Sequence, residues 1–212
     1  MNSAELVAVF RAEVNDIERP HVWSDALLYT YIDEAQKQFC RLTEGIEDSR
    51  RFTLRIRPGK SWYDLDPAIL RIRSAHDAAT GREVPITTTE SMSTLQQWFD
   101  GVPGPLKALV SGLEKGVLRA LPTPSEALTI ELRTFRLPDD ICVGGEFEID
   151  RQHILNLLYW VKFRAYDIQD SDVRDEKKSE KYRAMFDAYC AKARVEQGRL
   201  RRPVATVAYG GI

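Results

Sequence analysis

The chain has 212 residues, enough for one domain or two small ones. Its 30 Lys and Arg stand against 32 Asp and Glu, a formal net charge of −2. This balance argues against general nucleic-acid binding through a strongly basic surface, although it leaves room for a local basic stripe. No apolar run approaches the length of a membrane span, and no basic region precedes the first apolar residues. We therefore expect neither a transmembrane helix nor a signal peptide.

Helical spacing of apolar residues predicts two helices before residue 48. The first covers "SAELVAVFRAEVNDI", and Ser3 is its expected N-cap. The second begins after Ser24, also an N-cap candidate, and the preceding Trp23 is placed to pack on Leu28 as a hydrophobic staple. Gly45 is the natural stop, because glycine readily adopts the left-handed conformation that ends many helices.

A strand is expected over residues 51–57, because charged and apolar residues alternate strictly there. One side carries Arg51, Arg55 and Arg57, and the other carries Phe52, Leu54 and Ile56. The arginines could contact phosphate groups, keep a sheet edge soluble, or pair with an acidic neighbouring subunit. The negative overall charge favours the last two interpretations. The three arginines are thus candidates for a surface that faces another subunit or DNA.

Short strand patterns continue to about residue 137, separated by Gly and Pro. A turn is expected at Thr80–Gly81 between two of these strands, and a short helical turn at residues 93–100. The spacing predicts a small antiparallel β-sandwich or barrel over this region.

Helical spacing returns after residue 146. One helix is expected over residues 154–168, apolar on so much of its circumference that it must be buried on several sides. Asp172 is the expected N-cap of a last helix, with Asp175 and Glu176 in its first turn. The inner face of that helix is expected to comprise Tyr182, Met185, Phe186, Tyr189 and Ala193.

The order of helices, strands and helices favours an α+β protein. We expect residues 1–48 and 146–202 to form a helical bundle, with residues 49–145 as an inserted β domain. Residues 203–212 are then an extended C-terminal tail without a charged side chain. Such a tail is either a frayed terminus or a segment that becomes ordered on another chain.

The sequence contains no catalytic signature. Its histidines, His21, His76 and His153, fall in different elements, and the cysteines, Cys40, Cys142 and Cys190, form no CxxC pair. The cysteines favour buried thiols in a reducing compartment. Asp64 with Asp66, and the acidic residues at 167–176, could bind a divalent ion, but a turn and a capped helix start explain them more simply. We expect no enzyme activity, no cofactor and no metal.

Four segments together resemble the tailed-phage head-to-tail connector family. Residues 21–41 are similar to that family's first long helix, in which a tryptophan and a polar cap open the helix. Residues 61–92 and 98–138 resemble its strand segments, including the corner Leu121-Pro122-Thr123-Pro124. Residues 154–190 resemble its closing pair of helices. The resemblance covers nearly the whole chain and lies in apolar and turn residues.

The resemblance implies a virion structural protein of the phage neck or tail, made in the host cytoplasm and without enzymatic activity. Such adaptors form rings, usually of twelve copies, that dock under the portal and bridge it to the downstream tail or nozzle protein. Genome DNA passes through the lumen without sequence-specific binding. In several members the C-terminal segment docks on the portal, which makes the apolar tail a candidate docking strand. Its residues would be Pro203, Val204, Val207, Tyr209 and Ile212.

Two other hypotheses remain open at this stage. The chain could be another neck, tail-completion or interaction module with the same architecture and a different partner. Less simply, it could be a divalent-metal enzyme that uses the acidic clusters. Neither hypothesis predicts a membrane association.

Overall fold

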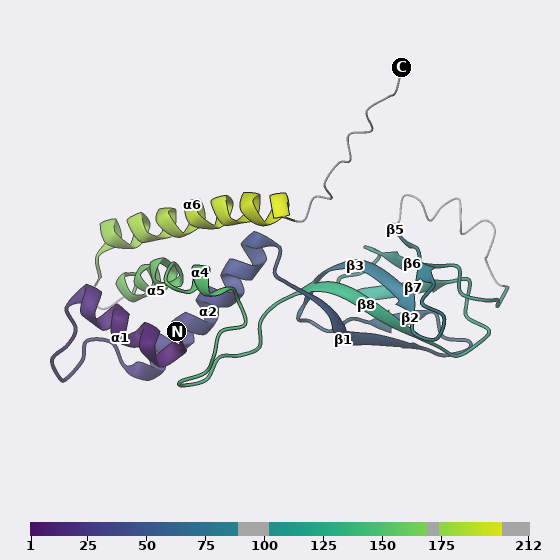
Figure 1. Ribbon diagram of the computed structural model, residues 1–212, viewed down its shortest axis with the longest axis horizontal. Helices are drawn as coiled ribbons and strands as arrows, with labels where there is room; N and C mark the ends of the chain where they lie inside the picture. Colours follow the sequence, from purple (N-terminus) through teal and green to yellow (C-terminus); the bar gives the residue numbers. More distant parts are fainter. Residues whose placement is uncertain (89–101, 169–173, 201–212) are drawn as a thin grey trace, which may run out of the picture. The chain divides into compact units, whose positions relative to one another are not determined.

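The computed structural model describes residues 1–88, 102–168 and 174–200. The chain divides into two compact units, one from residues 1–43 with the described residues after 138, and the other from Glu44–Pro138. Figure 1 shows the first as helical and the second as built of strands. The sequence pattern placed the corresponding boundaries at 48/49 and 145/146. Within the described ranges, no helix is long and apolar enough to cross a membrane.

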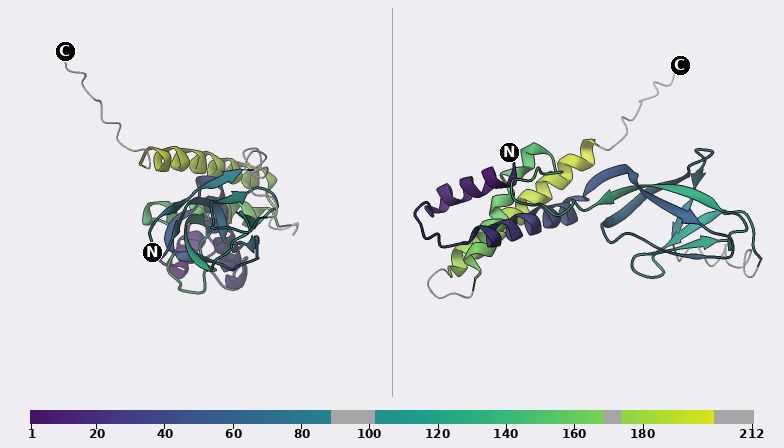
Figure 2. Two further views of the ribbon diagram at one scale, coloured as in Figure 1. Left: turned by 90° about the vertical axis from the view of Figure 1, so that its right-hand side faces the viewer. Right: turned by 90° about the horizontal axis from the view of Figure 1, so that it is seen from below.

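The helical unit contains α1 (Ser3–Val14), α2 (Asp25–Thr43), α4 (Arg151–Ile154), α5 (Leu157–Tyr166) and α6 (Glu176–Leu200). Helix α5 packs against both α2 and α6, while α1 packs against α2 and α5 (Figures 1 and 2). The core between them is formed by fully buried side chains, including Leu6, Phe10, Leu28, Ile32, Leu157, Val161 and Phe186.

The starts of α1 and α2 are both capped, but only one cap is the predicted residue. Asn2 caps α1: its side chain accepts from the Glu5 N–H at 2.9 Å, and the Glu5 carboxylate accepts from the Asn2 N–H at 2.9 Å. Ser3, the predicted cap, is buried, and its hydroxyl donates to the Cys142 carbonyl at 2.8 Å. For α2 the prediction is confirmed, because the Ser24 Oγ accepts from the Leu27 N–H at 3.3 Å.

Helix α2 ends where two consecutive residues adopt positive φ angles, 87° at Glu44 and 84° at Gly45. A Cβ on Gly45 would lie 2.6 Å from the Arg136 carbonyl oxygen, so both the backbone conformation and the close approach require glycine there. The predicted stop at Gly45 is therefore confirmed, with the last helical residue at Thr43.

The C-terminal helices differ from the prediction in two ways. The expected helix at 154–168 is divided into α4 and α5, because Asn156 and Leu158 donate to carbonyls three residues back and form a tighter turn. The last helix begins at Glu176, so its cap is Asp175, whose carboxylate accepts from the Lys178 N–H at 3.0 Å. Asp172 lies outside the described residues. The predicted inner face is confirmed for Phe186 and Ala193, whereas 36% of Met185 is exposed.

The β unit contains two four-stranded sheets of described strands. The first has the order β1-β8-β3-β4, formed by β1 (Ile46–Ile56), β8 (Leu128–Arg136), β3 (Ile69–Asp77) and β4 (Glu83–Val84). The second has the order β2-β7-β6-β5, formed by β2 (Trp62–Asp64), β7 (Val117–Leu121), β6 (Ala108–Ser111) and β5 (Ile86–Thr88).

The sheets correct the expectation of a purely antiparallel region. Strands β5 and β6 pair in parallel, with Ile86 opposite Leu109, and no closed barrel is formed by the described strands. The predicted turn at Thr80–Gly81 is confirmed between β3 and β4, where Gly81 has φ 69°. Both sheets contribute to one core, formed by Phe52, Leu54, Ile56, Tyr63, Ala75, Val84, Leu109, Leu118, Ala120, Ile130 and Leu132.

Candidate interaction surfaces

The exposed arginines of β1 form the first candidate surface. Arg51, Arg55 and the adjoining Arg57 are exposed, whereas Phe52, Leu54 and Ile56 are 9%, 7% and 2% exposed. This alternation confirms the predicted half-buried strand. In the described sheet, β1 is an edge strand that pairs with β8.

A partly buried carboxylate shapes the start of this arginine row. Asp48 accepts from the backbone N–H groups of Arg50 and Arg51, each at 3.0 Å, and from the Arg136 Nε at 2.8 Å. The register between β1 and β8 shifts here, between Asp48 and Phe52. Burial opposes ionisation of Asp48, but the hydrogen bonds outweigh it and lower the pKa of this carboxyl below its usual value. The ionised Asp48 therefore holds the bulge that precedes the arginine row.

The arginine row is suited to electrostatic contact with another molecule. Guanidinium groups bind carboxylates and phosphates through several N–H donors at once. The opposite residues on β8 are Thr129 across from Arg55 and Glu131 across from Thr53, so one carboxylate lies within the same exposed face. The Arg51 guanidinium also lies 5.6 Å from the centre of the Phe52 ring.

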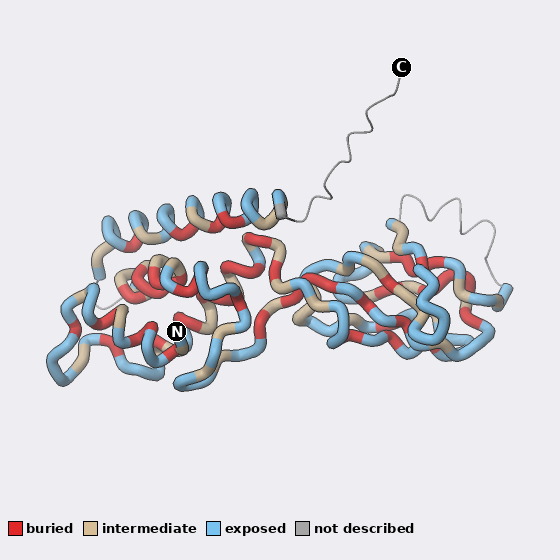
Figure 3. Tube along the Cα trace, in the orientation of Figure 1, coloured by how far each residue is buried: buried red, intermediate tan, exposed pale blue. Residues whose placement is uncertain are grey.

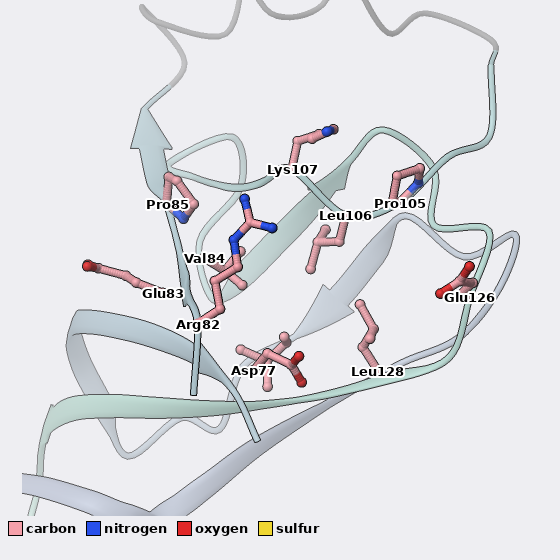
Figure 4. A pocket seen from close by; sticks show the side chains of 11 residues that line it. Asp77, Arg82, Glu83, Val84, Pro85, Pro105, Leu106, Lys107, Glu126 and Leu128 are labelled. Carbon is pink, nitrogen blue, oxygen red and sulfur yellow. The ribbon is translucent and has the colours of Figure 1, made fainter. Parts of the chain in front are cut away.

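A pocket of about 390 Å³ lies in the β unit (Figure 4). Its apolar lining comes from Val84, Leu106, Leu128 and Ile130, with Pro85 and Pro105, and its charged lining from Asp77, Arg82, Glu83, Lys107 and Glu126. Asp77 accepts from the Thr80 hydroxyl at 2.6 Å and from the Ala79 N–H at 3.2 Å, which together lower its pKa. Its carboxylate thus closes a turn, and the residues lining the pocket offer no nucleophile beside a base.

The acidic clusters serve local structure in the described part of the chain. The Asp66 carboxylate accepts from the Ala68 N–H at 2.8 Å, and Asp175 caps α6. Asp64 is exposed on β2, and Asp170 and Asp172 lie outside the described residues. Among residues 1–88, 102–168 and 174–200, no group of three His, Cys, Asp or Glu side chains could hold a metal ion.

The histidines and cysteines are mostly packing residues. His153 is 3% exposed, its Nδ1 lies 2.7 Å from the Tyr189 hydroxyl, and burial lowers its pKa. Cys40 and Cys190 are buried as expected, whereas Cys142 is exposed and corrects the expectation that all three thiols are buried. His21 and His76 lie near Asp16 and Ser74.

The candidate docking residues of the tail, Pro203, Val204, Val207, Tyr209 and Ile212, lie outside the described residues. The sequence pattern predicted only the inner face of α6. Figure 3 shows that α6 leaves a long exposed face on the side away from its neighbours. We define the outer face of α6 as Lys177, Lys181, Ala184, Met185, Ala188, Ala191, Lys192, Val195 and Arg199, all of which are exposed. A helical projection of residues 176–199 would have found it.

Comparison with known proteins decides the family. A family model described as SU10 adaptor protein matches residues 1–207. The chain belongs to this family. The match confirms the resemblance to phage head-to-tail adaptors and spans both the helical and the β unit. No match was found among curated proteins.

Membership gives the adaptor its general role. It is a structural phage protein and a component of the virion, and it interacts with other virion proteins. The exposed arginine row and the outer face of α6 are candidate surfaces for such interactions.

Proposed function

We propose that the adaptor forms a ring that docks under the portal, bridges it to the downstream tail or nozzle protein, and lets genome DNA pass without sequence-specific binding. The family match over residues 1–207 carries this proposal, because it covers almost the whole chain and not a single motif. The proposal places the adaptor in the virion neck after synthesis in the host cytoplasm. A ring of twelve copies is the expected stoichiometry.

The two units have separate roles in this proposal. The helices form a bundle that serves as the body of each subunit, and the two sheets form a sandwich that is inserted between α2 and the segment before α4. The division at 48/49 and 145/146 that the sequence suggests differs by a few residues from the compact units. A sandwich is favoured because both sheets contribute side chains to one core.

The apolar tail is the proposed docking segment on the portal. Ordering about ten residues costs on the order of 10–20 kcal/mol of conformational entropy, so the tail needs several anchors. Pro203, Val204, Val207, Tyr209 and Ile212 supply such anchors by adding to a sheet edge or filling an apolar groove. A ring also binds through many weak contacts at once, and its overall affinity is high because the first contact raises the effective concentration of the others.

The arginine row of Arg51, Arg55 and Arg57 is proposed to face a neighbouring subunit or the DNA. Pairing with a subunit fits an acidic chain with a net charge of −2. A DNA-lining role is less favoured, because arginines that bind phosphates would retain the genome instead of letting it slide.

The test is the mass of the complex that the full-length adaptor forms with the portal of the same phage. It is compared with a chain that stops at Arg202 and with a chain whose residues 203–212 are replaced by a Gly/Ser segment of equal length. A stoichiometric ring that both tail variants weaken supports the proposal. A full ring with every chain keeps the adaptor function and refutes the role of the tail.

Absence of any complex with the portal would favour the alternative, a different neck or tail-completion module. Binding of a divalent ion that is lost on Asp64→Asn or Asp66→Asn would instead favour the enzyme hypothesis. The enzyme hypothesis is the least supported of the three functions, because the carboxylates of Asp66 and Asp175 already accept hydrogen bonds from backbone N–H groups.

A further inference from the structure

The outer face of α6 has an unusual composition for an exposed helix surface. Successive helical residues turn by about 100°, and all nine residues of this face lie within about 60° of one line along the helix. Four are Lys or Arg and five are Ala, Met or Val, with no carboxylate among them. Val195 is 55% exposed and Met185 is 36% exposed. The face thus combines apolar and positive side chains, while the exposed carboxylates of Glu180 and Glu196 lie about 20° beyond its edges.

The carboxylates of α6 lie off this face. Residues 174–200 carry eight Lys and Arg against five Asp and Glu, and those acids project to the sides or lie at the first turn. Lys192 and Glu196 are spaced to pair along the helix, but the nine residues of the outer face themselves carry only positive charge. Segregation of one sign around apolar residues favours contact with an acidic surface that also has an apolar centre.

The same unit carries a surface of that kind. We call residues 139–150 the acidic segment, since it contains five Asp and Glu and neither Lys nor Arg. Near its middle, Val143 is 71% exposed and is followed by Gly144 with φ 71°. Cys142 beside it is also exposed. Asp140 in this segment pairs with Lys37 of α2, whereas Glu146 and Asp150 are exposed. An exposed apolar side chain close to these carboxylates complements the apolar and positive outer face of α6.

The acidic segment is fixed in place by α1 and α2. The Gln36 side chain donates to the Asp139 carbonyl at 3.0 Å, and the Asp33 carboxylate accepts from the Ile141 N–H at 3.0 Å. The Ser3 hydroxyl donates to the Cys142 carbonyl, and the Ser3 N–H donates to the Gly145 carbonyl at 3.0 Å. The segment is therefore presented in one conformation and loses little freedom on binding.

One chain cannot bring the two surfaces together. The outer face of α6 points away from α2 and α5, on which α6 packs, while the acidic segment is attached to α1 and α2. Two copies can. Because the two surfaces are different, the contact is head-to-tail, and such contacts form a ring when the rotation between successive copies closes.

We propose that the outer face of α6 in one copy binds the acidic segment of the next copy. This inference rests on the proposed ring function and names the surfaces that build the ring. Lys192 and its neighbours pair with the carboxylates around Glu146, while Ala188, Ala191 and Val195 cover Val143. DNA is the less favoured occupant, because phosphates gain nothing from Ala188, Ala191 and Val195, which belong to the same face.

A charge-reversal cycle on the full-length adaptor tests the proposal. Lys192→Glu and Glu146→Lys are made singly and together, and assembly is measured by sedimentation and native mass, alone and with the portal ring. Each single reversal is expected to raise the concentration for half-assembly at least about tenfold, which corresponds to ~1.4 kcal/mol. The double reversal is expected to recover most of the loss. Ala188→Glu places a charge among the apolar residues of the outer face and is expected to weaken assembly without rescue by Glu146→Lys.

The matched control is Arg194→Glu, which makes the same charge change on the same helix about 120° from the centre line of the outer face. It is expected to assemble like the unmodified chain. All changed residues are exposed, and circular dichroism confirms that each variant is folded.

The outcomes separate the inference from the function on which it rests. If the unmodified adaptor forms no ring with or without the portal, the proposed function fails. If it forms a ring and the reversals at 192 and 146 assemble as well as the control, the ring stands and the proposed surfaces are wrong. Loss of duplex DNA binding in Lys192→Glu with normal assembly would overturn the inference in favour of a DNA-facing surface.

Discussion

Truncation of Phe186 tests whether the packing of α6 on α5 holds the helical unit together. Phe186 is fully buried, and its ring centroid lies 5.1 Å from that of Trp160 on α5. Phe186→Ala removes the ring and leaves a cavity, and comparable substitutions cost about 3–5 kcal/mol. Since a domain is commonly stable by only about 5–15 kcal/mol, this variant is expected to lose a large part of the stability of the helical unit.

The assay is a urea titration followed by far-UV circular dichroism, which reports mainly on the helices. With a urea m-value of about 1–3 kcal/mol/M, the midpoint is expected to fall by at least about 1 M. The control is Met185→Ala on the adjacent residue, which is 36% exposed and is expected to change stability by less than about 1 kcal/mol. Equal midpoints for the two variants would refute the assignment of the inner face of α6.

Two further predictions concern titratable groups. Cys142 is exposed, whereas burial raises the pKa of Cys190 to about 12, so mass spectrometry of the folded chain after limited alkylation is expected to find the label on Cys142. Label on Cys190 at an equal rate would contradict the described packing. Burial lowers the pKa of His153 below its usual 6.5, opposed by Asp150 and Glu196, so the unfolded chain binds a proton that the folded chain does not. The contribution of His153 to the free energy of unfolding is expected to be fully present above about pH 6.5 and to be lost as the pH falls below that value. His153→Gln is expected to make this loss of stability with falling pH less steep. An unchanged acid slope in chemical denaturation would show that His153 does not contribute.

Features set by neighbouring residues could be predicted from the sequence. The alternation at residues 51–57 gave the correct burial of Phe52 and the correct exposure of Arg55. Ser24 and Gly45 were correctly assigned as the start and stop of α2, because caps and left-handed stops depend on a few adjacent residues.

Features that depend on distant partners could not be predicted. Ser3 has the right chemistry for a cap, but its hydroxyl is taken by a carbonyl 139 residues away, and Asn2 replaces it. The parallel pairing of β5 with β6 joins Ile86 to Leu109 across more than twenty residues, and no local pattern specifies its direction.

The candidate surfaces show the same contrast between local and long-range features. The arginine row could be predicted because its residues alternate within one strand. The pocket near Asp77 could not be predicted, because its lining comes from segments about fifty residues apart in the sequence. The outer face of α6 could be predicted from a helical projection of the sequence. The fixed conformation of the acidic segment could not, because it depends on long-range hydrogen bonds to α1 and α2.

The pairing of β1 with β8 has a consequence for how this protein can diversify. Ile46, near the start of the β unit, lies opposite Arg136, near its end. Paired strands hold the Cα atoms of such residues only about 5 Å apart, so the β unit begins and ends at nearly the same point. An inserted unit whose two ends lie close together can change in size without separating the segments that flank it. Changes of length within the β unit can therefore leave the ends of the helices on either side of it in place.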